Sequence, residues 1–143
     1  MIGQCLCGEV QFEISGSMPD FYQCHCSLCQ KLSGSTSDTA TFLDKVQFKW
    51  LKPNPDIKSY KTSTGFRCDF CQQCGSTVPH LMQNGEQYWV PAGLLDQQID
   101  SVVAAHLFVE SKARWDVIGD DGTQYDEMPS MNELNDTLQR GKS

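Results

Sequence analysis

The sequence predicts a mostly β fold built from short strands, and three observations support this prediction. Short segments alternate apolar and polar residues, eight cysteines gather in tight clusters, and a helical pattern is scarce before residue 130. A chain of 143 residues is long enough for one core. Because short strands bury limited apolar area, we expect metal crosslinks at the cysteines to contribute much of the stability.

Four segments are predicted to be strands, and the first two show the period-two alternation of half-buried strands. In residues 8–14, Val10, Phe12 and Ile14 alternate with polar side chains. The other three segments are residues 46–50, with Val46, Phe48 and Trp50 on one face, residues 87–90 and residues 102–109. Proline and asparagine in residues 52–55 break the chain after the second segment. The pattern indicates short antiparallel strands joined by loops that carry cysteines.

A short helix is predicted near the C-terminus. Ser130 and Glu133 have the spacing of a capping box, and Met131, Leu134 and Leu138 share one helical face. We expect one domain over residues 1–129, followed over residues 130–143 by this helix and a frayed tail that begins at residue 140.

Charge and the N-terminal residues indicate a soluble setting. The formal charge of −7 argues against nucleic acid and anionic membranes as partners, because both reward a basic surface. No secretory signal and no spanning segment is recognisable, so we expect the cytoplasm. In that compartment, clustered cysteines favour zinc over a disulfide framework.

The first candidate metal site combines two cysteine pairs that each end in glycine. These are Cys5 and Cys7, followed by Gly8, and Cys71 and Cys74, followed by Gly75. A metal-binding turn needs an abrupt change of chain direction, and glycine allows positive φ there at little cost. Four thiolates close a tetrahedral zinc shell, so we predict a structural zinc. Reduced thiols or disulfides are the alternative.

The second candidate site is a loop in which Cys24, Cys26 and Cys29 lie within six residues. Three thiolates leave a fourth position open, as a catalytic zinc requires. Water, a substrate thiol or His25 could take that position, although a side chain between two ligands usually points away from the metal. We therefore expect His25 to support the site from beside it. The alternative is a second structural zinc that a remote Cys or His completes.

The remaining polar and aromatic residues are expected to be structural. Cys68 is interpreted as a buried thiol, with ligation of the second zinc as the alternative. His80 and His106 are expected to be structural residues and not ligands, and His106, within an apolar run, fits a satisfied core imidazole. The three tryptophans are interpreted as core or pocket-wall aromatics; they are Trp50, Trp89 and Trp115. Three carboxylates are interpreted as a solvated acidic stretch; they are Asp120, Asp121 and Asp126.

The cysteine motifs resemble those of the glutathione-dependent formaldehyde-activating enzyme family, also called the Gfa-like or centromere-protein-V/GFA domain. The matching segments are residues 3–10, residues 24–29 with Ser33 and Gly34, residues 70–76 and residues 106–115. The resemblance implies a β-tent fold similar to the Mss4-like proteins. It also implies a structural zinc on Cys5, Cys7, Cys71 and Cys74, and a catalytic zinc on Cys24, Cys26 and Cys29.

The resemblance further implies a carbon–sulfur lyase that joins formaldehyde to glutathione, giving S-(hydroxymethyl)glutathione. The expected partners are then a small thiol and a small carbonyl compound. His25, Ser27 or Ser33 is expected to relay a proton. Because glutathione is anionic and this chain is acidic, local cations must hold it, and the candidates are Lys31, Lys61 and Arg67. The rival hypothesis is a non-enzymatic zinc module that binds a protein partner.

Overall fold

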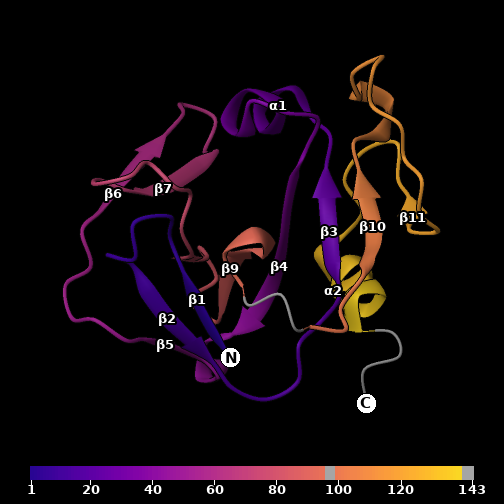
Figure 1. Cartoon of the computed structure of the whole chain (residues 1–143). Coiled ribbons are helices and arrows are strands. Elements are labelled where there is room, and N and C mark those ends of the chain that lie inside the picture. Colours follow the sequence, from indigo (N-terminus) through magenta and orange to yellow (C-terminus); the bar gives the residue numbers. More distant parts are fainter. Residues whose placement is uncertain (96–98, 140–143) are drawn as a thin grey trace. The chain divides into compact units, whose positions relative to one another are not determined.

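The computed structural model describes residues 1–95 and 99–139, and these residues form two compact units (Figure 1). The first unit combines Met1–Ser17 with Phe42–Ile99, and the second combines Met18–Thr41 with Asp100–Ser143. Each unit is therefore built from segments that are distant in sequence. Among the helices of the described residues, none combines the length and the apolar character that crossing a bilayer needs.

The first unit begins with a small antiparallel sheet in which β2 lies between β1 and β5. Its strands are β1 (Ile2–Gln4), β2 (Gln11–Ile14) and β5 (Phe48–Trp50). The predicted alternation is confirmed in β2, where Phe12 and Ile14 are buried and Glu13 is exposed. Phe12 stacks on Phe48 with ring centroids 5.2 Å apart, so this sheet covers an aromatic core.

Two hairpins complete the first unit. They are β6 (Ile57–Lys61) with β7 (Arg67–Cys71), and β8 (His80–Leu81) with β9 (Gln87–Pro91), followed by the 3₁₀ turn η2 (Ala92–Leu94). Val10 and Val78 are fully buried in one cluster with the side chains of Cys5 and Cys71. The hydrophobic core of this unit therefore directly contacts two of the predicted zinc ligands.

The predicted strand over residues 46–50 is wrong in its first half. Residues Lys45–Gln47 form the 3₁₀ turn η1, and the Val46 side chain is 84% exposed. The turn is held by a hydrogen bond from the Lys45 amide to Glu86 O and by one from the Ser15 amide to Gln47 O, both 2.9 Å long. The spacing of Val46 and Phe48, two residues apart, is compatible with a continuous strand and equally with a turn followed by a strand, so the pattern could not distinguish the two.

The second unit is organised around a strand pair that runs parallel. Its elements are β3 (Phe21–Cys24), α1 (Ser27–Ser33), β4 (Asp38–Asp44, which continues into the first unit), β10 (Val103–Leu107), the 3₁₀ turn η3 (Val109–Ser111), β11 (Thr123–Gln124) and α2 (Met131–Gln139). Strand β3 pairs with β4 antiparallel, whereas β10, which lies in the segment predicted over residues 102–109 as one of the antiparallel strands, pairs with β3 and β11 parallel. Alternation reports which face a residue takes and carries no information on strand direction.

The C-terminal helix is confirmed as α2. The Glu133 amide donates to Ser130 Oγ at 3.1 Å, which is half of the predicted capping box. Leu134 and Leu138 are buried on the predicted face. The predicted tail over residues 140–143 lies outside the described residues, and the domain boundary at residue 129 stays a prediction.

Candidate metal centres

The four cysteines predicted for the first site come together in the first unit. Cys5 and Cys7 lie in the turn between β1 and β2, Cys71 ends β7, and Cys74 lies in the next turn. Their four sulfurs all lie within 4.8 Å of one another. The Cys5–Cys7 and Cys7–Cys71 sulfur distances are 3.6 and 3.8 Å. A tetrahedral zinc with Zn–S bonds of about 2.3 Å needs sulfurs about 3.8 Å apart, so the group fits zinc.

The turns have the backbone geometry that the glycines predict. Gly8 and Gly75 adopt φ of 82° and 79°, in the left-handed region that side chains disfavour. The Gly75 amide donates to Cys71 O at 2.8 Å, and the Val10 amide donates to Cys5 Sγ at 3.3 Å. Amides aimed at sulfur stabilise a thiolate, which is the form that binds a metal.

Neighbouring groups make one thiol of this site strongly acidic. The hydrogen bond between Cys74 and the Ser76 hydroxyl, 3.3 Å long, is the first reason why the pKa of Cys74 falls to about 5. A backbone hydrogen bond from Glu9 lowers the pKa of Cys7, but desolvation and the other thiols raise it to about 12. In the absence of metal, Cys74 therefore loses its proton much more readily than Cys7, and binding of a divalent cation would displace the proton that Cys7 keeps.

The second group is smaller and consists of three thiols. Cys24 ends β3, Cys26 is the N-cap of α1, and Cys29 lies in the first turn of that helix. Their sulfurs lie within 4.8 Å of one another, and within the described residues no fourth Cys, His, Asp or Glu belongs to the group. The motif was predicted as a loop, whereas its second half is helical. The helix brings the Cys29 amide to Cys26 Sγ at 3.3 Å.

The three thiols interact strongly with one another. A hydrogen bond from Cys29 lowers the pKa of Cys24 to about 7, while the same contact and burial raise the pKa of Cys29. Asp38 pairs with Cys24 across the β3–β4 ladder, and burial raises the pKa of its carboxyl to about 6. The arrangement offers a divalent cation three sulfurs from one short segment and leaves a fourth tetrahedral position without a described protein ligand.

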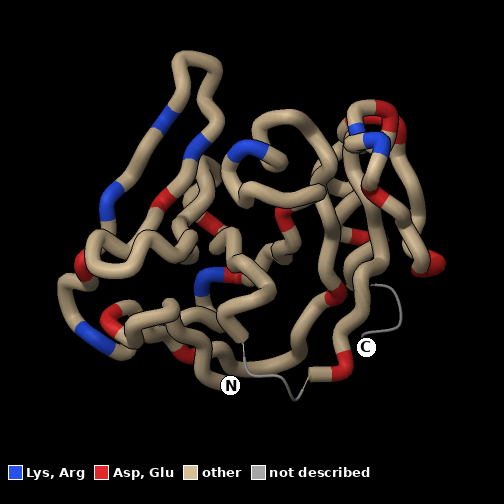
Figure 2. The backbone as a smooth tube through the Cα atoms, turned by 45° about the horizontal axis from the view of Figure 1, so that its top comes forward, with Lys and Arg blue, Asp and Glu red and all other residues tan. Residues whose placement is uncertain are grey.

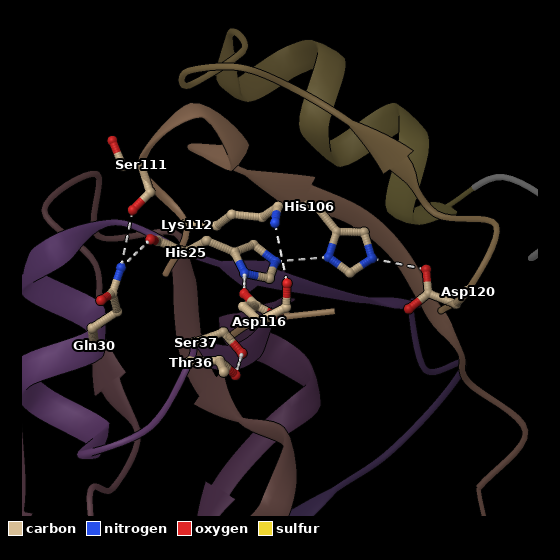
Figure 3. A network of polar contacts seen from close by, with 9 residues as sticks. All are labelled: His25, Gln30, Thr36, Ser37, His106, Ser111, Lys112, Asp116 and Asp120. Atoms are coloured by element: carbon tan, nitrogen blue, oxygen red, sulfur yellow. Dashed lines mark hydrogen bonds and ion pairs between the residues drawn. The ribbon is translucent and has the colours of Figure 1, made fainter. Parts of the chain in front are cut away.

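His25 lies between Cys24 and Cys26 in the sequence, and its side chain is 1% exposed. Figure 3 shows the polar contacts of its ring. Its Nδ1 is 2.6 Å from Asp116 Oδ2, and its Nε2 is 2.9 Å from His106 Nδ1. His106 is fully buried, as predicted for a satisfied core imidazole, and its Nε2 is 2.8 Å from Asp120 Oδ1. Asp120 is exposed, as predicted for a solvated stretch, and its contact with His106 is a feature that the sequence did not indicate.

Asp116 is the functional candidate that sequence reasoning missed. It lies 91 residues after His25, within an irregular segment, and no pattern links the two positions. Only its adjacency to Trp115, inside the last matching motif, singles out this part of the chain.

The remaining predicted residues are placed as follows. Cys68 is 7% exposed in β7, with Sγ 3.8 Å from Asp69 O, which confirms a buried thiol. His80 stacks on Trp89 with ring centroids 5.2 Å apart, and burial lowers its pKa to about 4. Trp115 is 68% exposed and lines a hollow of about 290 Å³ with Ser27, Gln30, Lys31, Gly34 and Ser35.

These features define a class of small, mostly β proteins with one four-cysteine and one three-cysteine group, each able to hold zinc. The sequence profile of the glutathione-dependent formaldehyde-activating enzyme family matches residues 1–111. The chain belongs to this family.

A crystal structure of a Rhodobacter sphaeroides protein shares the fold. The TM-score is 0.55 at 23% sequence identity, over 70% of this chain and 92% of that one. No curated protein matches the sequence.

Proposed function

We propose that the protein is a zinc-dependent carbon–sulfur lyase that joins a glutathione-like thiol to a small aldehyde, with S-(hydroxymethyl)glutathione as the product when the aldehyde is formaldehyde. The observation that carries the proposal is the three-cysteine group, which leaves one metal position open to substrate within the described residues. Membership of the family supports the substrate class. A purely architectural zinc has no need of an open position.

The two zinc ions would have different roles. Cys5, Cys7, Cys71 and Cys74 would hold a structural ion, and Cys24, Cys26 and Cys29 would hold the catalytic one. Zinc at the second group would supply Lewis acidity and keep a substrate thiol deprotonated. All eight cysteines are free thiols, which suits the reducing cytoplasm in which we place the reaction.

Lys31 is the best placed of the three predicted cations for an anionic thiol. It lines the 290 Å³ hollow together with Ser27, the residue after Cys26, and with the exposed Trp115. A carboxylate of the substrate would meet the Lys31 ammonium while the indole covers its apolar part. The hollow thus offers charge, hydrogen-bonding groups and an aromatic wall next to the three-cysteine motif.

The other two cations lie in the first unit, on the β6–β7 hairpin (Figure 2). Lys61 and Arg67 line a separate hollow of about 180 Å³ with His80. Arg67 is already paired with Asp69 through Nε at 2.8 Å and Nη2 at 2.9 Å. This paired guanidinium has less capacity left for a substrate carboxylate than the ammonium of Lys31.

Proton transfer to the substrate is assigned to a hydroxyl next to the metal ligands. The His25 ring uses both nitrogens in buried hydrogen bonds, so in this proposal it supports the catalytic group from behind. Ser33 Oγ accepts a hydrogen bond from the Ser35 amide at 3.1 Å. Ser27 is exposed beside Cys26 and lines the hollow, which makes its hydroxyl the better relay.

The first test is the reaction itself. Zinc-loaded protein mixed with glutathione and formaldehyde is expected to form the adduct faster than the spontaneous reaction, measured by NMR exchange between free and adduct signals. Protein stripped of zinc serves as the control. Absence of acceleration across a panel of thiols would reject the lyase and favour the rival hypothesis of a zinc module that binds a protein partner.

The metal content gives a second test. Freshly isolated protein is expected to contain two zinc ions per chain, because seven cysteines form two groups of sulfurs spaced for metal. A mild chelator should remove the ion of the three-cysteine group first, since three ligands exchange more readily than four. Elemental analysis with sulfur coordination from zinc-edge spectroscopy measures both. A single ion per chain, in protein kept from chelator and oxidant, contradicts the second site.

A further inference from the structure

Four polar side chains of the second unit form one continuous chain of contacts that includes His25 of the three-cysteine motif (Figure 3). In order, they are Asp116, His25, His106 and Asp120, joined by contacts of 2.6, 2.9 and 2.8 Å. The first three side chains are buried, and Asp120 is 42% exposed at the outer end. Each imidazole has a partner at both nitrogens, so neither ring can rotate without breaking a buried hydrogen bond.

The position of His25 in the sequence makes this chain relevant to metal binding. His25 lies between Cys24 and Cys26, so a fixed ring also fixes the peptide that joins two of the three thiols. The backbone on this side is held as well, because the His25 amide donates to Leu107 O at 2.9 Å. Gln30 Nε2 donates to His25 O at 2.9 Å and to Ser111 O at 3.1 Å.

The two aspartates at the ends of this chain of contacts lie in a segment without regular structure. Asp116 belongs to the stretch between η3 and β11, in which Lys112 Nζ donates to Asp116 O at 3.1 Å. Asp120 accepts from the Gly122 amide at 2.8 Å as well as contacting His106. The carboxylate of Asp116 contacts His25 directly and that of Asp120 contacts it through His106, so both link this irregular segment to the three-cysteine motif.

We propose that Asp116 and His106 are positioning residues that hold the three-cysteine group in its metal-binding geometry through His25, and that Asp120 orients His106. Because the three cysteines come from one segment of six residues, that segment alone makes few contacts that fix the positions of their sulfurs. Side chains that support metal ligands from outside typically change metal affinity by about 10–100-fold. The inference rests on the proposed zinc at this group and is independent of the reaction proposed for it.

A pair of substitutions at His106 separates positioning from simple packing. In His106→Asn, the side-chain amide lies where Nδ1 lies, and it can keep the contact with His25. In His106→Gln, the amide reaches the position of Nε2, so it can keep Asp120 while the contact with His25 is lost. Both variants remove the same buried ring, and a merely structural role predicts similar effects.

The measurement is zinc release to an excess of a coloured chelator, which resolves a fast ion at the three-cysteine group and a slow ion at the four-cysteine group. His106→Gln is expected to accelerate the fast phase by about tenfold, at the lower end of the range for supporting residues. His106→Asn should stay closer to the parent, and the slow phase should not change. Cobalt substituted at the fast site should show an altered thiolate absorption in His106→Gln alone.

A second pair of variants, at Asp120 and Asp121, tests the inference without substituting the buried His106, whose variants could fail to fold. Asp120→Asn should accelerate the fast phase by a smaller factor, and Asp121→Asn, at an exposed neighbouring carboxylate, should match the parent. Equal release from both His106 variants, with no difference between the two aspartate variants, overturns the inference while the proposed function stands. A parent protein that lacks the fast zinc overturns both. The expected difference in release among the variants, together with a parent protein that forms no adduct above the spontaneous rate, rejects only the reaction.

Discussion

Cys74→Ser is expected to cost the protein its structural zinc and much of its stability. The four-cysteine group joins residues 64 positions apart, at Cys7 and Cys71, and two of its cysteines pack in the core of the first unit. A structural zinc can contribute on the order of 10 kcal/mol to folding. A domain has a net stability of only about 5–15 kcal/mol. Thermal unfolding should therefore begin at least about 10 °C lower, with one zinc fewer per chain.

Cys68→Ser is the matched control for that variant. Cys68 is a buried thiol three residues before Cys71, and its sulfur belongs to neither cysteine group. The substitution makes the same chemical change without removing a ligand, so two zinc ions should remain. If both variants lose the same amount of stability and Cys74→Ser keeps its zinc, the structural site as assigned is wrong.

Cys26→Ser is expected to abolish turnover while the protein stays folded. Cys24, Cys26 and Cys29 span six residues, so a metal there restrains little of the chain. Serine is also a preferred N-cap, and it can accept the hydrogen bond that Cys26 Sγ receives from the Cys29 amide. The variant should contain one zinc, unfold within a few degrees of the parent and form adduct only at the spontaneous rate.

Comparison of the two cysteine variants decides what the three-cysteine group does. Thermal unfolding, zinc content and adduct formation are measured on Cys26→Ser, Cys74→Ser and the parent under one set of conditions. An equally large loss of melting temperature in both would mean that the three-cysteine group is structural. The open metal position would then have no catalytic role, and the lyase proposal would fall with it.

Much of both cysteine groups was predictable because ligand spacing is a local property of the sequence. The pairs at Cys5 and Cys71, each followed by glycine, predict tight turns, and the structure has those turns. The C-terminal helix was predictable for the same reason, since Ser130 and Glu133 are three residues apart. The buried face of β2 follows from strict alternation.

The parts that escaped prediction depend on short elements or on distant contacts. Helix α1 has only seven residues, too few for a periodic pattern, and its N-cap is a cysteine, which is not a typical capping residue. The parallel direction of β10 is not encoded in alternation. The contact of His25 with Asp116 joins residues 91 positions apart, so a single sequence offers no sign of it.

The parallel pairing of β3 with β10 has a consequence for the order of events during synthesis. His106 is made 81 residues after His25, which at about 5–20 residues per second is a delay of roughly 4–16 s. Until then, Cys24, Cys26 and Cys29 are on the nascent chain, but strand β10, which pairs with β3 in the folded protein, has not been made. Long-range pairing of this kind also slows folding after release. A zinc ion captured early would meet three thiols whose supporting carboxylate at Asp116 has not yet been translated.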